Sequence, residues 1–173
     1  MIAYLFFHHL ADGEDAVEYE AGLRHFHVAL RDAGIPGFDS SRTYRLEDGY
    51  CDWYVVANSA ALDPLNDAAV TGSRSELHDV VARRAVNFTG KLLKLAAGRY
   101  DPDSLVEIRF SKPKGMSYED LYARLEPWTS RSDTSLWRRM LVLGPPPEFS
   151  LLARAPEALP RAMDPVERRL DPV

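Results

Sequence analysis

Residues 43–56 read TYRLEDGYCDWYVV, and this stretch decides the fold. Two runs rich in aromatic and β-branched residues flank the dipeptide Asp48-Gly49. Such a dipeptide is typical of a two-residue type I′ turn, because both central residues of that turn adopt positive φ. The pattern therefore predicts a β-hairpin whose chain doubles back at residues 48 and 49.

The predicted turn places Tyr44 opposite Trp53 and Arg45 opposite Asp52. Because side chains alternate between the two sides of a strand, the hairpin has two distinct faces. One face is expected to pack against helices, and it comprises Tyr44, Leu46, Cys51, Trp53 and Val55. The other face is amphipathic, and it comprises Thr43, Arg45, Glu47, Tyr50, Asp52, Tyr54 and Val56.

The hairpin completes a βαββ pattern over residues 2–58. The strand IAYLFFHHL precedes an amphipathic helix that ends at Gly34, and the hairpin follows. A similar pattern spans residues 105–154, where LVEIRF, SYEDLYARLEP, LWRRMLVL and EFSLLARA succeed one another. This order predicts an α+β fold with an antiparallel sheet and helices on one face.

The segment between the two patterns predicts a long helix. Ser73 and Glu76 form a capping box, and apolar residues recur at helical spacing over residues 75–98. We therefore expect a single domain over residues 1–155. Residues 156–173 contain prolines and few clustered apolar residues, so they are expected to form a C-terminal arm, either disordered or laid across a partner subunit.

Composition excludes several classes of protein. The chain has 173 residues, of which 46% are hydrophobic and 27% charged, and its net charge is −5. No basic stripe is present, which argues against binding to nucleic acid or to an anionic membrane. The lone Cys51 cannot form an internal disulfide, which indicates a reducing compartment. The N-terminal apolar run breaks at His8-His9, too early for a signal peptide or a transmembrane helix. We expect a cytoplasmic protein.

The five histidines lack the spacing of a metal site. Two ligands share a face at a spacing of three or four in a helix, or of two in a strand. His8 and His9 are adjacent in a strand, and His25 and His27 are two apart in a helix, so neither pair shares a face. No feature selects one histidine as a haem ligand. We therefore expect no metal and no cofactor.

Arg45 and Asp52 form the sharpest polar constellation, and it has two interpretations. One is an ordinary cross-strand ion pair, which contributes about 0.2–1 kcal/mol. The other is a ligand-binding patch in which the arginine grips an acid or enolate while neighbouring groups move protons. The ligand-binding candidates are Arg45, Asp52, Thr43 and Tyr54. The catalytic candidates are His8, His27 and Tyr54. Burial decides between the two interpretations, because a buried pair must be fully hydrogen-bonded.

The element order β-α-β-β-α-β over residues 1 to about 111 resembles the ferredoxin-like fold. With the second βαββ pattern it resembles the dimeric α+β barrel superfamily more closely. That superfamily includes antibiotic-biosynthesis monooxygenase-like, EthD-like and chlorite dismutase-like proteins. The resemblance implies a homodimer, with pockets between sheet and helices, but it transfers no catalytic residue.

Three functions remain open, and the sequence does not decide whether the protein is an enzyme. The first is binding of a small aromatic or acidic molecule, with a cofactor-independent monooxygenase- or isomerase-like activity. Aromatic residues on neighbouring strands, among them Tyr4, Phe6 and Tyr54, favour it. The second is a non-catalytic oligomerisation or regulatory module. The third is a haem-binding protein of the chlorite dismutase-like type.

Overall fold

The computed structural model describes residues 1–173, and its chain divides into two compact units. The N-terminal unit comprises Met1–Lys91 with Asp171–Val173, and the C-terminal unit comprises Leu92–Leu170. Each unit combines helices with an antiparallel sheet, so the predicted α+β class is confirmed. The single domain over residues 1–155 stays a prediction.

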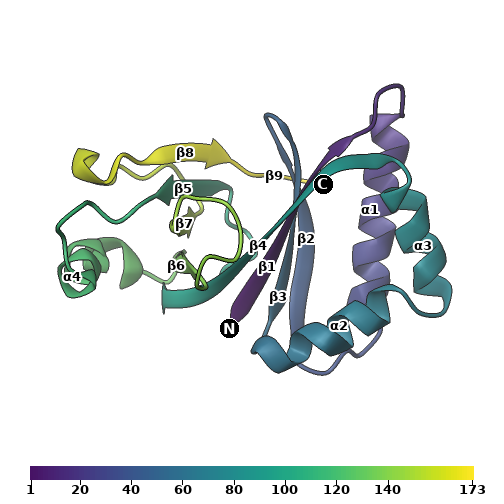
Figure 1. Cartoon of the computed structure of the whole chain (residues 1–173), viewed down its shortest axis with the longest axis horizontal. Helices are drawn as coiled ribbons and strands as arrows, with labels where there is room; N and C mark the ends of the chain where they lie inside the picture. Colours follow the sequence, from purple (N-terminus) through teal and green to yellow (C-terminus); the bar gives the residue numbers. More distant parts are fainter. The chain divides into compact units, whose positions relative to one another are not determined.

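The N-terminal unit is built on the first βαββ pattern, which is confirmed. It contains β1 (Ile2–Leu10), α1 (Ala16–Arg31), β2 (Phe38–Leu46), β3 (Gly49–Val56), η1 (Ser59–Ala61), α2 (Leu62–Ala69), α3 (Ser73–Ala82), the start of β4 (Ala85–Gly98), and β9 (Asp171–Pro172). The strand order is β4-β1-β3-β2-β9. The three helices lie on one side of β1, β2 and β3 (Figure 1).

Helix α1 forms where the apolar periodicity predicts it. Asp15 caps its start, since the Asp15 carboxylate accepts a hydrogen bond of 2.9 Å from the backbone N–H of Glu18. The sequence predicts an apolar stripe of Tyr19, Leu23, Phe26, Leu30 and Ala33. The first four are buried, whereas Ala33 lies beyond the end of the helix and is half-buried. Two polar residues, Glu20 and His27, are buried on the same helix. The buried side of α1 therefore needs polar partners as well as apolar ones.

The predicted register of the hairpin is wrong by two residues. Leu46 pairs with Gly49, so the loop consists of Glu47 and Asp48, and Tyr44 lies opposite Cys51. The expected Tyr44–Trp53 and Arg45–Asp52 pairs do not form. Trp53 lies opposite Arg42 instead, and Asp52 lies opposite Thr43. A shift of two residues keeps each side chain on its own face, because alternation has a period of two. Membership of the two faces is therefore as expected.

The predicted orientation of the two faces is also wrong. The amphipathic face packs against the helices, because Thr43 and Asp52 contact His27 of α1 and Arg45 contacts Glu20. Alternation turns Tyr44, Cys51 and Trp53 to the opposite side, where they are buried. The polar groups on the buried side of α1 explain this choice, since an apolar face would leave them without hydrogen bonds.

Replacing Gly49 by alanine is expected to destabilise the protein by about 1–3 kcal/mol. Gly49 has φ of 132°, and an added Cβ would lie 2.7 Å from the backbone oxygen of His8. Gly13→Ala is the control, because Gly13 also has positive φ but no atom lies within 4 Å of the added Cβ. Urea unfolding should show the larger loss for Gly49→Ala, and equal losses would contradict the close approach of β1.

The predicted helix over residues 75–98 is wrong beyond its first third. Helix α3 ends at Ala82, and the chain continues as β4. Asn87 has φ of 59°, which interrupts a helical path. From Leu93 onward the more buried residues alternate with exposed ones, as in a strand. Leucine, valine and alanine at mixed spacing fit both periods, and pairing with neighbouring strands decides in favour of β4.

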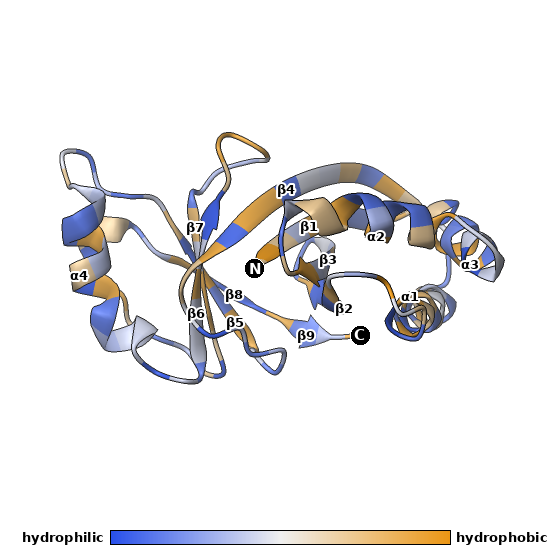
Figure 2. Ribbon diagram, turned by 90° about the horizontal axis from the view of Figure 1, so that it is seen from below, coloured by the Kyte–Doolittle hydropathy of each residue, from blue (hydrophilic) through white to orange (hydrophobic).

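The C-terminal unit is built on the second βαββ pattern, which is confirmed. It contains the rest of β4, then β5 (Val106–Phe110), α4 (Tyr118–Thr129), β6 (Thr134–Arg139), β7 (Phe149–Ala153), η2 (Arg161–Met163) and β8 (Val166–Arg169). The strand order is β8-β5-β7-β6-β4. Helix α4 carries hydrophobic and hydrophilic residues along its length (Figure 2). Its Leu121 and Leu125 pack on Ile108, Phe110 and Leu151 in the core.

The expected C-terminal arm folds onto strands of its own chain. β8 pairs with β5 in the C-terminal unit, and β9 pairs with β2 in the N-terminal unit. Leu159, Met163 and Leu170 are buried and anchor the segment. The expectation of a disordered arm is therefore wrong, whereas contact of this segment with a partner subunit stays a prediction. None of the helices is both long and apolar enough to cross a membrane.

Candidate functional site

A polar cluster gathers on the helix-facing side of the N-terminal sheet because of alternation and register. Phe6 lies opposite Asp52, and Asp52 lies opposite Thr43, so these three residues form one row across β1, β3 and β2. The neighbouring rows follow the same rule. One row comprises Tyr4, Tyr54 and Ser41, and the other comprises His8, Tyr50 and Arg45.

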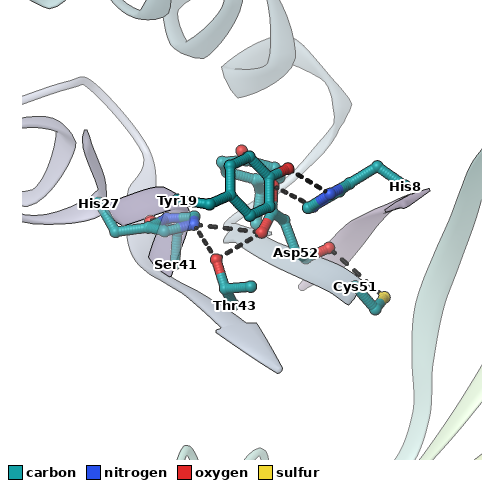
Figure 3. Close-up of polar contacts among 8 residues, drawn as sticks. His8, Tyr19, His27, Ser41, Thr43, Cys51 and Asp52 are labelled. Carbon is teal, nitrogen blue, oxygen red and sulfur yellow. Dashed lines mark hydrogen bonds and ion pairs between the residues drawn. The ribbon is translucent and has the colours of Figure 1, made fainter. Parts of the chain in front are cut away.

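Asp52 lies at the centre of the cluster, and only 3% of its surface is exposed. The hydroxyl of Thr43 donates to its Oδ1 at 2.5 Å, and the hydroxyl of Tyr54 donates to its Oδ2 at 3.1 Å. Figure 3 shows the side chains that converge on this carboxylate. These two hydrogen bonds from neutral donors use part of the carboxylate's capacity to accept hydrogen bonds, and two imidazoles lie near its oxygens as well.

His8 approaches the Asp52 carboxylate from β1, and His27 approaches it from α1. Nε2 of His8 lies 3.4 Å from Oδ2, and Nε2 of His27 lies 3.4 Å from Oδ1. The other ring nitrogens each contact a hydroxyl at 2.7 Å, Nδ1 of His8 that of Tyr19 and Nδ1 of His27 that of Ser41. With each Nδ1 accepting from a hydroxyl, the Nε2–H of His27 donates to the Thr43 hydroxyl at 2.9 Å, and Nε2 of His8 lies beside Asp52 without forming a hydrogen bond.

The electrostatics of the cluster keep Asp52 ionised and the phenols neutral. Burial raises the pKa of Asp52, but the adjacent imidazoles of His27 and His8 outweigh burial and hold that pKa below its ordinary value. Burial, reinforced by the charge of Asp52, raises the pKa of Tyr54 well above the ordinary value and raises that of Tyr19 too. The cluster therefore presents one carboxylate surrounded by neutral hydroxyl donors and two imidazoles.

Arg45 belongs to a separate ion pair. Its Nε and Nη2 donate to the Glu20 carboxylate at 2.8 Å and 2.6 Å, and the hydroxyl of Tyr50 donates to the same carboxylate at 3.0 Å. The hydrogen bond from Arg45 is the main cause that lowers the pKa of Glu20. The predicted ion pair between Arg45 and Asp52 is therefore wrong, and Arg45 links α1 to β2 instead.

Two adjoining pockets open between the helices and the sheet of the N-terminal unit. The inner pocket has a volume of about 250 Å³, and the outer pocket one of about 460 Å³. Both are lined by Phe6, Phe26, Tyr54 and His78. The inner pocket is further lined by His8, Tyr19, Leu23, Asp52, Val81, Ala82, Ala85 and Phe88. The outer pocket is further lined by Tyr4, Leu62, Asp63, Leu65, Asn66 and Ala69.

The structure brings most of the sequence-derived candidates together. His8, Asp52 and Tyr54 line the inner pocket, whereas His27 and Thr43 contact Asp52 without lining either pocket. Their roles in binding or catalysis stay predictions.

Sequence reasoning missed the contributions of Tyr19, Ser41 and His78 to this region. Tyr19 was counted only as part of the apolar stripe of the first helix. One signal was available for it, since a buried tyrosine hydroxyl usually finds a hydrogen-bond partner. For Ser41 and His78 no local pattern carries such a signal, because their neighbours are brought to them by the fold.

The lining of these pockets supplies no cationic side chain for the propionates of a haem. Histidine, cysteine, methionine and tyrosine are the usual axial ligands of its iron. Both ring nitrogens of His8 face Tyr19 and Asp52, and neither pocket is lined by lysine or arginine. Among all the side chains, no group of three or more His, Cys, Asp or Glu residues is arranged to hold a metal ion.

No family model matches the chain, and no curated protein matches its sequence. A protein from Lactobacillus acidophilus NCFM, proposed to be a monooxygenase, matches in structure with a TM-score of 0.64 and 10% identity, over 99% of this chain and 93% of that one. A protein proposed to be a chlorite dismutase matches with a TM-score of 0.51 and 12% identity, over 98% and 94% of the two chains.

A variant of the chlorite dismutase from Candidatus Nitrospira defluvii matches with a TM-score of 0.50 and 8% identity, over 99% of this chain and 91% of that one. At such low identities the likeness concerns the fold alone. Together with the two βαββ patterns, these matches confirm the expected architecture. The protein has the fold of the dimeric α+β barrel type.

Proposed function

We propose that the N-terminal unit binds a small aromatic molecule between its sheet and helices and removes a proton from it. The protein would thus act as a cofactor-independent enzyme of the isomerase or monooxygenase type. The observation that carries the proposal is the ionised Asp52 held between two imidazoles at the inner pocket. A buried carboxylate paired with histidine is a common arrangement for general base catalysis.

The pocket walls support an aromatic ligand. Phe6 stacks on Phe88 with a centroid distance of 5.5 Å, and Tyr4 stacks on Tyr54 at 6.2 Å. Flat rings of this kind favour a planar occupant. The two volumes together are in the range of small-molecule sites, about 300–1,000 Å³. An acidic ligand has less support, because no lysine or arginine lines either pocket.

The series of contacts from Tyr19 through His8 to Asp52 suits proton removal. Tyr19 and His8 both line the inner pocket, and Tyr19 donates to Nδ1 of His8. In the proposed step a substrate C–H bond breaks and its proton passes to the Tyr19 oxygen, while the Tyr19 proton passes to Nδ1. The imidazolium that forms is stabilised by the Asp52 carboxylate. The raised pKa of Tyr19 favours such a coupled transfer over a free phenolate.

The step leaves the substrate as an enolate, and two outcomes balance. Returning the proton to a different carbon completes an isomerisation without any further reagent. Addition of O₂ to the enolate carbon, with return of the proton, forms a hydroperoxide. Loss of water from it breaks the O–O bond and leaves a new carbonyl, so one oxygen atom enters the product and the other leaves as water. Both outcomes share the first proton transfer, so that transfer is the decisive measurement. Homodimer formation stays a prediction.

The test uses 2-tetralone, an aromatic ketone with acidic methylene protons, in D₂O. The protein should accelerate exchange of those protons by about 100-fold or more over buffer, as observed by proton NMR. Tyr19→Phe and His8→Gln should each remove most of this acceleration, because each interrupts the transfer to His8. An oxygen electrode then distinguishes oxygenation from isomerisation.

His9→Gln is the matched control, since His9 is the exposed neighbour of His8 on the same strand. Circular dichroism checks that all three variants fold. Exchange no faster than in buffer would overturn the proposed function, and so would exchange that Tyr19→Phe and His8→Gln leave unchanged.

A further inference from the structure

The carboxylates that line the two pockets meet no lysine or arginine in that lining. Asp52 belongs to the inner pocket and Asp63 to the outer pocket, and no lysine or arginine lines either. Asp52 is buried and ionised, so its field is only partly screened by solvent. The aromatic rings add to this preference, because their faces attract cations. A carboxylate on a ligand would meet repulsion at both ends of the cleft.

The two pockets adjoin each other and have different ends. The four residues that line both pockets, Phe6, Phe26, Tyr54 and His78, form the shared middle. The inner end carries Tyr19, His8 and Asp52. The outer end is formed by α2, whose Leu62 and Leu65 present apolar surface and whose Asp63 and Asn66 are polar and exposed. A molecule that occupies both pockets therefore meets oxygen acceptors beyond its aromatic part.

We infer that the cleft binds an elongated aromatic molecule with a cationic amine at the end that faces Asp63 and Asn66, and that it excludes carboxylated analogues. The inference rests on the proposed function, because the aromatic ring is taken to occupy the inner pocket. It adds the substrate class and assigns recognition of its ammonium group to Asp63. Asp63 attracts the ammonium group, and the oxygen of Asn66 accepts a hydrogen bond from it.

The experiment compares three naphthols that differ only at position 6. They are 2-naphthol, 6-(aminomethyl)-2-naphthol and 6-hydroxy-2-naphthoic acid, and binding is followed by their fluorescence at pH 8. The amine should bind about three- to fivefold more tightly than 2-naphthol, as for an exposed ion pair, and the acid more weakly by a similar factor. Sodium chloride at 0.5 M should shrink both differences.

Asp63→Lys should reverse the order of the amine and the acid. Asp67→Lys is the matched control, because Asp67 is an exposed carboxylate on the same helix that lines neither pocket. That variant should keep the wild-type order. Equal affinities for the three naphthols would overturn the inference, and so would equal effects of the two lysine substitutions.

The outcomes separate this inference from the proposed function. Accelerated proton exchange with no discrimination among the naphthols would leave the proposed function standing and remove the inference. Discrimination without exchange would support the amine-binding cleft and remove the catalytic proposal. No binding of any naphthol would overturn the inference.

Discussion

Replacing Asp52 by alanine is expected to lower the free energy of unfolding by about 3–5 kcal/mol. The carboxylate is buried and accepts hydrogen bonds from Thr43 and Tyr54, and the rings of His8 and His27 lie beside it. Its removal leaves these donors buried without an acceptor, and an unsatisfied buried donor costs about 1–3 kcal/mol. Urea unfolding at pH 7 measures the loss.

Two variants serve as comparisons for Asp52→Ala. Asp52→Asn keeps the side-chain volume and one acceptor oxygen, so a smaller loss is expected. Asp39→Ala removes an exposed carboxylate from the same sheet, and it should change stability by no more than about 0.5 kcal/mol. If Asp52→Ala lowers the free energy of unfolding no more than Asp39→Ala does, the hydrogen bonds to Asp52 do not stabilise the protein as expected.

Stability is expected to fall as the solution becomes acidic, and Asp52 should be a main cause. Its pKa in the folded protein lies below the ordinary value, so the unfolded chain takes up this proton first as the pH falls. The stabilisation is therefore complete above the unfolded pKa of about 3.9 and is lost towards the lower folded pKa. Glu20, whose pKa is also lowered, acts in the same direction.

The measurement is the free energy of unfolding of the wild type and of Asp52→Asn between pH 7 and pH 3. The wild type should lose stability more steeply below about pH 5, because the variant has no carboxyl group to protonate at this position. The difference between the two curves should therefore shrink as the pH falls. Parallel curves would contradict a lowered pKa of Asp52 in the folded protein.

The two histidines around Asp52 differ in what they can do. His8 lines the inner pocket and reaches Tyr19, which lines it as well, so this pair can exchange protons with a bound molecule. His27 contacts Ser41, Thr43 and Asp52 and lines neither pocket. His27 is accordingly a positioning residue, which holds the Asp52 carboxylate from the side opposite His8.

Much of the fold follows from local patterns. The stripe of α1 is read from spacing, and residue type offers Asp12 or Asp15 as its cap, of which the structure uses Asp15. Both βαββ patterns are confirmed. The segment over residues 85–98 is one that local patterns predict wrongly. Its apolar residues fit a helix nearly as well as a strand, and hydrogen bonds to distant strands decide between them.

The sequence by itself determined which side chains share a face of the hairpin, because alternation is a local property that survives a shift of two residues. Thr43, Asp52 and Tyr54 were therefore grouped correctly, although their cross-strand partners were not. Only the tertiary structure decided that this face meets α1 and that His8 and His27 close on Asp52. His27 and Asp52 are 25 residues apart in the chain. Contacts over such separations depend on how whole elements pack, and no local pattern contains that information.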